Sequence, residues 1–233
     1  MESILKTLAA CPAPSGAESR IREAISSFFE GEDIKTDVHG SLILHKKGTG
    51  DGTVILTAMD TPSLYVTYAE GGFARFSAVG GLKPSDGVAV LCEGNVLGVV
   101  GTDSVGQFID TGAHTLETGM WAVPMPSFCK VDDTLCFGAS MGQYAAMCAS
   151  IRAAMTKTEK DVYFVFAAKS HIRQLSPSFM QGVKATKLLS VEVSAANDYP
   201  GEKAVFAGLS RGTALRVKDE GMLSSLPLLG ELE

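Results

Sequence analysis

The sequence has 233 residues, 45% of them hydrophobic and 20% charged, a composition that excludes disordered, collagen-like and disulfide-scaffold chains. A chain of this length forms one large domain or two small ones, and it buries enough surface to need no disulfide or metal for stability. Twenty basic against 26 acidic residues give a net charge of −6 without a basic stripe, which argues against nucleic acid as a partner.

The first part of the chain is predicted to be α/β. Apolar residues recur at helical spacing over residues 2–10 and 17–29, on either side of a break that contains two prolines and a glycine. Ser41–Leu44 and Thr53–Thr57 are apolar and β-branched, as strands are. The turn-rich Gly48–Gly52 between them favours a β-hairpin.

Between about residues 67 and 134 the pattern changes. Glycine recurs every few residues, and the pieces between, such as Val88–Cys92 and Val96–Val100, are short and rich in β-formers. This segment is predicted to be a small all-β domain. It would be inserted into an α/β domain made of residues 1–66 and 135–233. A continuous helix between residues 85 and 125 would contradict this division.

The α/β pattern then returns. A helix is predicted for Ser140–Met155, and an apolar strand that is buried on both faces for Asp161–Ala168. A helix over Phe179–Thr186 and a strand over Leu188–Val193 follow. Two more strands are predicted at Ala204–Phe206 and Thr213–Val217.

Location and redox state are also predicted. Five cysteines without a C-x-x-C pair indicate neither a disulfide framework nor a thiolate zinc site. No apolar run approaches the ~18 residues that span a bilayer, and the N-terminus lacks a signal-peptide pattern. We therefore expect a cytoplasmic protein with no membrane partner.

Several motifs follow one another in an order typical of a known family. Pro12–Glu18 reads P-A-P-S-G-A-E, Asp37–Leu42 reads D-V-H-G-S-L, and Val54–Asp60 leads on to Val79-Gly80-Gly81. Together with later stretches at 191–198 and 211–219, they resemble the dinuclear-metal aminopeptidases that form tetrahedral particles, the glutamyl aminopeptidase and endoglucanase-like group. The resemblance implies a mixed sheet flanked by helices, as in zinc peptidases, with an inserted β-domain.

The resemblance also implies where the site lies, and there the sequence departs from the family. The family's H-x-D motif reads Ala58-Met59-Asp60, so alanine replaces the first histidine ligand. The counterpart of Asp60 orients that histidine in the family, so Asp60 is either a remnant of the catalytic site or a turn residue before Thr61-Pro62. The family's bridging aspartate falls at or near Ser140.

The residues at the family's other ligand positions also differ from those of the family. The family's Glu-Glu pair, a general base and a ligand, falls on Ser170 and His171, and its later aspartate falls on Glu192. The chain ends before the segment that carries the family's last histidine, so we expect a degenerate, C-terminally truncated member.

The donors that remain are too few for two metal ions. Zinc takes about four ligands, three of them from the protein even in a catalytic site. Glu192 and His171 could hold one ion weakly, as a remnant of the metal site, and Ser170 cannot take a proton from metal-bound water as a carboxylate does. We therefore expect no cofactor, and zinc or cobalt only if the chain is an active enzyme.

Three functions stay open at this point. The first is a pseudoenzyme that binds peptides or takes part in assembly. It would form a dimer or small oligomer, with peptides or a catalytic paralogue as partners. The second is an active metallo-aminopeptidase that removes N-terminal residues from peptides. The third is different chemistry in the same cleft. A triad of Ser170, His171 and Asp60 is disfavoured, because adjacent strand residues point to opposite faces.

Other ionisable residues receive simpler interpretations. Glu192 is predicted to lie within an apolar strand, where an unpaired carboxylate is costly, so it either faces the cleft or forms a structural ion pair. His39, His45 and His114 stand in turn or strand-edge contexts and are expected to be solvated.

Overall fold

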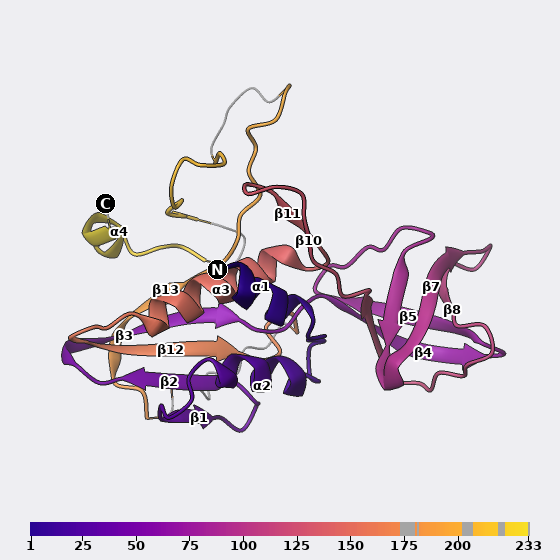
Figure 1. Cartoon of the computed structure of the whole chain (residues 1–233), viewed down its shortest axis with the longest axis horizontal. Helices are drawn as coiled ribbons and strands as arrows, with labels where there is room; N and C mark the ends of the chain where they lie inside the picture. Colours follow the sequence, from indigo (N-terminus) through magenta and orange to yellow (C-terminus); the bar gives the residue numbers. More distant parts are fainter. Residues whose placement is uncertain (173–179, 181, 202–206, 219–221, 233) are drawn as a thin grey trace. The chain divides into compact units, whose positions relative to one another are not determined.

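The computed structural model describes residues 1–172, 180, 182–201, 207–218 and 222–232 of the chain. They fall into two units, Met1–Glu192 and Val193–Glu233, which are described separately. The first unit contains a mixed sheet with helices and a small closed β-barrel (Figure 1). The mixed α/β class with a β-rich part is thus confirmed, while the predicted domain boundaries stay a prediction.

The mixed sheet has five strands in the order β1-β2-β12-β3-β13. Strand β12 pairs antiparallel with β2 and parallel with β3, and β3 also pairs parallel with β13 (Figure 1). The carboxyl ends of β3, β12 and β13 therefore meet at one edge, which we call the carboxyl edge. The bounds are β1 (Ile34–Thr36), β2 (Leu42–Lys46), β3 (Thr49–Ala58), β12 (Lys160–Ala167) and β13 (Ala185–Ser190).

The predicted hairpin between β2 and β3 is wrong, because β12 lies between these two strands. A Cβ atom on Gly48 would lie 2.3 Å from the carbonyl carbon of Lys160, and one on Gly52 would lie 2.1 Å from the carbonyl oxygen of Lys184. The glycines therefore let the backbones beside β3 approach closely, instead of forming a tight turn from β2 to β3.

Three helices pack on one face of the sheet, α1 (Glu2–Ala9), α2 (Ser19–Ser27) and α3 (Met141–Met155). Tyr163 and Val165 of β12 lie in the core cluster of the opposite face. Both faces of β12 are buried, as predicted. Helix α3 leads into β12 through a short connection and packs on β3 and β12, so its first turn lies toward the carboxyl edge. The main core cluster includes Leu8, Ile21, Ile25, Leu44, Met147, Ile151, Phe164 and Phe166.

The barrel closes in the order β4-β5-β8-β7-β6-β9, with β9 paired back to β4. Its interior is apolar and includes Leu64, Val90, Val100 and Ile109. The single helical turn η1 (Glu93–Asn95) is the only helix between residues 85 and 125, all of which are described. The barrel strands are β4 (Ser63–Glu70), β5 (Phe73–Val79), β6 (Ala89–Cys92), β7 (Val96–Thr102), β8 (Gln107–Asp110) and β9 (Trp121–Pro124).

A short hairpin of β10 (Cys129–Lys130) and β11 (Cys136–Phe137) follows the barrel. It pairs Cys129 with Phe137 and Lys130 with Cys136, so the two cysteines point to opposite faces of the hairpin. All five cysteines are free thiols, in line with the sequence prediction.

Two predictions for the C-terminal part are corrected. The helix predicted over Phe179–Thr186 is wrong for residues 182–186, while residues 179 and 181 lie outside the described residues. Ala185 and Thr186 begin β13 instead, because Gly52 of β3 leaves room for this backbone. Thr213–Val217 form no strand in the described residues, because a strand needs a neighbouring strand to pair with. The β-bridge recorded here joins the next residue, Lys218, to Leu223.

The predicted strand Ala204–Phe206 lies outside the described residues. The second unit also contains α4 (Leu226–Leu232). Within the described ranges, none of the helices combines the length and the apolar character that crossing a membrane requires.

Candidate functional site at the carboxyl edge

The carboxyl edge brings together four of the positions that the resemblance singles out. Ala58 ends β3 and lies opposite Ala167 of β12, whose carbonyl accepts a hydrogen bond from the Met59 amide at 2.9 Å. Asp60 lies two residues beyond the end of β3, and Ser170 and His171 follow β12. Parallel strands end at the same edge, so these side chains from distant parts of the sequence become neighbours.

Asp60 is fully buried and holds the loop after β12 by its backbone. Its Oδ1 accepts the Ser170 amide at 3.0 Å, and its Oδ2 accepts the His171 amide at 3.0 Å. The Ser15 hydroxyl also donates to Oδ2, at 2.5 Å. The three donors stabilise the charge of a carboxylate that burial alone would penalise. Asp60 here orients a backbone rather than an imidazole.

Glu18 has a parallel role that the sequence interpretation missed. It is 2% exposed, and its Oε1 accepts the Gly16 amide at 2.7 Å and the Lys169 amide at 2.8 Å. Lys169 has a φ of +57°, a left-handed conformation that is uncommon for a residue with a side chain. Asp60 and Glu18 thus clamp three successive amides, Lys169 to His171. The available signal was the motif Pro12–Glu18, which ends in this glutamate.

Tyr65, at the start of the barrel, joins the same network. Its hydroxyl donates to the carbonyl oxygen of Ser15, the residue that also bonds Asp60. Burial raises the pKa of Tyr65, and the charge of Glu18 raises it further. The tyrosine therefore remains a neutral donor that ties strand β4 to the segment before α2.

The side chains of the loop after β12 are engaged locally. The Ser170 hydroxyl donates to the carbonyl of Ala167 at 3.1 Å. The His171 ring packs against Gly80, where an added Cβ would lie 2.9 Å from its Cγ. The His171 Nε2 atom is buried and has no hydrogen-bond partner among the described residues. In this arrangement Asp60 contacts the amides of Ser170 and His171, not the imidazole that a catalytic triad would require.

Ser140 and Glu192 occupy different settings. Ser140 precedes α3 in a left-handed conformation with a φ of 54°. Glu192 lies two residues beyond β13 and is exposed, and its Oε1 accepts the Ser190 hydroxyl at 3.0 Å. The premise that Glu192 lies within a strand is therefore wrong, because β13 already ends at Ser190. None of the ion pairs in the described residues involves Glu192.

One of the three remaining histidines is not solvated as predicted. His45 is half-buried, its Nε2 lies 2.9 Å from Oδ1 of Asp161, and its ring stacks on Tyr163 with centroids 3.9 Å apart. The hydrogen bond with His45 lowers the pKa of Asp161. His39 and His114 are exposed. His45 misled the sequence interpretation because its partners are 116 and 118 residues away in the chain.

The donors at the carboxyl edge can be compared with those of the metal centre that the resemblance implies. In the parts of the chain that the structure describes, no three His, Cys, Asp or Glu side chains are grouped so that they could hold a metal ion. The oxygens of Asp60 accept hydrogen bonds from three donors, and Glu18 is engaged by the amides of Gly16 and Lys169. Of the positions that match the family's ligands, the described residues therefore offer the His171 imidazole and the exposed Glu192. A zinc ion takes at least three protein ligands, so this set does not fit a dinuclear centre.

Known proteins resemble the chain in sequence over most of its length. No protein-family model matches it. A protein of Acetivibrio thermocellus named "Putative aminopeptidase" is 29% identical over 247 residues, which cover 96% of this chain and 75% of that protein.

Solved structures share the fold. A TET aminopeptidase from the marine sediment archaeon Thaumarchaeota archaeon SCGC AB-539-E09 superposes with a TM-score of 0.86 at 19% identity, over 99% of this chain and 76% of that one. The TET1 peptidase of Pyrococcus horikoshii superposes with a TM-score of 0.72 at 20% identity, over 85% of this chain and 72% of that one.

Proposed function

We propose that the chain is a homologue of the tetrahedral aminopeptidases that retains their scaffold without their dinuclear metal centre. It would act as a non-catalytic peptide-binding or assembly protein. The homology rests on the aminopeptidase relative that matches 96% of the chain and on the shared fold. The loss of the metal centre is the proposal.

One observation carries this proposal. The loop after β12 is held by two buried carboxylates, Asp60 and Glu18, yet the side chains it presents are a serine and a histidine. Metal-dependent peptide hydrolysis needs a base that takes a proton from metal-bound water, and a positive centre for the developing oxyanion. The Ser170 hydroxyl at the position of that base donates to the Ala167 carbonyl and has no basic function.

Peptide binding at the same edge requires fewer functional groups than peptide hydrolysis does. It needs a stable surface and groups that pair with the peptide backbone or termini, and it needs no general base. The network of Asp60, Glu18, Ser15 and Tyr65 supplies the rigidity. Exposed Glu192, two residues beyond β13, supplies a negative charge at this edge that would favour the amino terminus of a peptide.

Turnover and metal content test the proposal directly. The purified protein is assayed with aminoacyl anilides and short peptides, with and without added Zn²⁺, Co²⁺ or Mn²⁺, and its bound metal is quantified. We expect no turnover and no stoichiometric metal pair. Metal-dependent release of N-terminal residues that Glu192→Ala abolishes and Glu159→Ala leaves unchanged would overturn the proposal. It would establish the alternative, an active metallo-aminopeptidase.

Self-association as a dimer or small oligomer is the second part of the proposal. The Pyrococcus horikoshii TET1 peptidase can assemble into a tetrahedron or a large octahedral shell. The hairpin β10–β11 exposes Val131, Leu135 and Phe137 by more than half each, an apolar surface that an interface would cover. Light scattering behind size exclusion tests this. A monomer of 24.4 kDa at tens of micromolar, or a complete twelve-subunit shell, would contradict it.

A further inference from the structure

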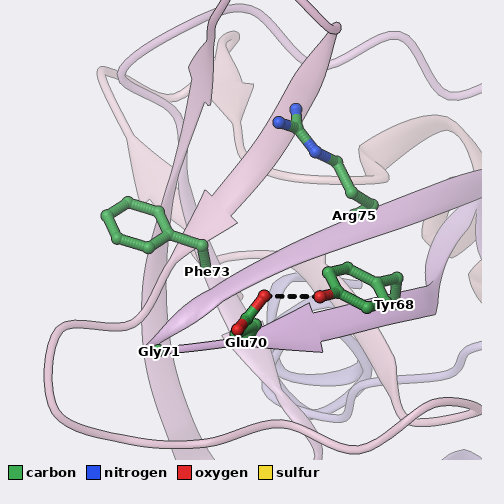
Figure 2. Close-up of a pocket in the computed structure, with 5 residues that line it drawn as sticks. All are labelled: Tyr68, Glu70, Gly71, Phe73 and Arg75. Carbon is green, nitrogen blue, oxygen red and sulfur yellow. Dashed lines mark hydrogen bonds between the residues drawn. The ribbon is translucent and has the colours of Figure 1, made fainter.

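The outer face of the barrel carries a hollow that the proposed function does not use. It is lined by Tyr68, Glu70, Gly71, Phe73 and Arg75 and has a volume of about 420 Å³ (Figure 2). This space is larger than a single amino-acid side chain needs, and two of its aromatic residues are unusually open to solvent. Tyr68 is 57% exposed and Phe73 is 51% exposed.

Strand register places Phe73 between two carboxylates. Glu70 of β4 lies directly opposite Phe73 of β5, and Asp110 of β8 lies directly opposite Phe73 on the other side. Directly opposed residues of antiparallel strands project from the same face, with Cβ atoms ~5 Å apart. Both flanking acids are exposed, so the open phenyl ring has a negative charge on each side.

A second aromatic residue reinforces this arrangement. The Tyr68 hydroxyl donates to Oε2 of Glu70 at 2.5 Å, as Figure 2 shows, and this bond raises the pKa of Tyr68. The Phe73 ring also makes an edge-to-face contact with the Phe108 ring, with centroids 5.4 Å apart. The ring of Phe73 is therefore held in place while one side of it faces solvent.

The one cation in the hollow is already neutralised. The Arg75 guanidinium lies 2.5 Å from Asp103 and donates to the carbonyls of Gly106 and Gln107, and in Figure 2 it points away from Glu70. The hydrogen bond from Arg75, together with the one from the Val105 amide, lowers the pKa of Asp103 to about 2. None of the ion pairs in the described ranges involves Glu70 or Asp110.

The charge of the whole barrel has the same sign. Residues 63–124 contain six acidic residues against two basic ones, and one of these two is Arg75. Two copies of the chain facing each other through this hollow would bring Glu70 and Asp110 against like charges. Such contacts are unfavourable at an interface, so a second copy is a poor occupant.

We propose that this hollow binds a lysine or arginine side chain of a partner polypeptide. The cation would lie over the Phe73 ring, which attracts positive charge through its quadrupole, and would pair with the carboxylates of Glu70 and Asp110. The self-association proposed above is assigned to other surfaces. The two proposals, and the question of catalysis at the carboxyl edge, therefore stand or fall separately.

A peptide titration followed by NMR tests the proposal. The probe is the blocked peptide acetyl-Gly-Gly-Lys-Gly-Gly-amide, added to the ¹⁵N-labelled full chain. Two matched peptides replace the lysine with norleucine or N-acetyl-lysine. We expect saturable shifts of the amides of Glu70, Phe73 and Asp110 with the lysine peptide alone, and weaker binding at high salt.

Variants locate the binding. We expect Phe73→Leu and Glu70→Gln each to weaken it at least fivefold. Asp86→Asn removes the same charge from another exposed position of the barrel, where the carboxylate accepts the Thr102 hydroxyl, and should change binding less than twofold. All three changes are at exposed positions, and the amide spectrum of each variant shows directly that it is folded.

Three results would overturn the proposal. The first is the absence of saturable shifts with the lysine peptide, or equal shifts with norleucine. The second is an Asp86→Asn variant that binds as weakly as Glu70→Gln, which would mean diffuse attraction by the barrel's net charge. The third is a fall in oligomeric mass of Phe73→Leu by light scattering, which would make this face an interface between copies.

Discussion

Replacing Asp60 with asparagine should destabilise the protein strongly although the shape of the side chain hardly changes. The substituted side chain would keep one acceptor oxygen and present an amide nitrogen where a second oxygen now accepts hydrogen bonds. If the asparagine oxygen takes the position of Oδ2, it still accepts the bonds from Ser15 and His171, but as a neutral acceptor. The Ser170 amide then faces the new amide nitrogen and loses its acceptor. One lost charge-assisted bond and two weakened ones give a loss of about 3 kcal/mol.

Urea unfolding followed by circular dichroism measures this loss. Asp51→Asn, at an exposed position of β3, is the matched control and should change the free energy of unfolding by less than about 0.5 kcal/mol. For a chain of this size the predicted loss corresponds to a fall in Tm of roughly 6–12 °C. If Asp60→Asn costs no more than Asp51→Asn, the three bonds to Asp60 do not hold the loop and the account of the carboxyl edge is refuted.

Three further predictions concern other parts of the chain. Gly48→Ala should cost about 2 kcal/mol, because its Cβ meets the neighbouring backbone. In the same urea titration Gly230→Ala, in a helix with open space around the added Cβ, should cost nothing and stabilise by up to about 1 kcal/mol. Thr57→Val should cost about 1–3 kcal/mol by leaving the buried Ser150 hydroxyl unpaired, and adding Ser150→Ala should recover part of it in a double-mutant cycle. Asp103 has a pKa of about 2, below its usual value of 3.8, so its ionised form stabilises the fold above about pH 4. The difference in unfolding free energy between wild type and Asp103→Asn should disappear as the pH falls through 2; a constant difference would contradict this.

The fold could be predicted where local pattern determines it. Helical periodicity located α1, α2 and α3, and the recurrence of glycine located the barrel. Strand order could not be read in the same way. The hairpin prediction assumed that β2 and β3 pair because they are neighbours in sequence, whereas the more apolar β12 lies between them and buries both its faces. The neighbouring sequence of β2 and β3 gives no sign that a strand from more than a hundred residues later lies between them.

The site shows the same division. The motif around Asp60 marked a residue that the structure places in a buried network, but its partners there are backbone amides, which leave no pattern in a sequence. Glu18 was overlooked for this reason, since its acceptor role appears only when Lys169 comes within 2.8 Å. Glu192 was misjudged because strand ends are among the least reliable predictions, and two residues decide whether it is buried or exposed.

The clamp on Lys169, Ser170 and His171 has a consequence for how the chain folds. These amides bond to acceptors 110 to 151 residues earlier, so the carboxyl edge cannot form until the chain has been synthesised well past β12. Contacts this distant form slowly, because a long loop must close before they contribute any stability. During synthesis the barrel, whose strands lie within residues 63–124, is complete first. Glu18 and Asp60 are synthesised long before the loop that they hold, and hydrogen exchange of the Lys169, Ser170 and His171 amides would report this closing step.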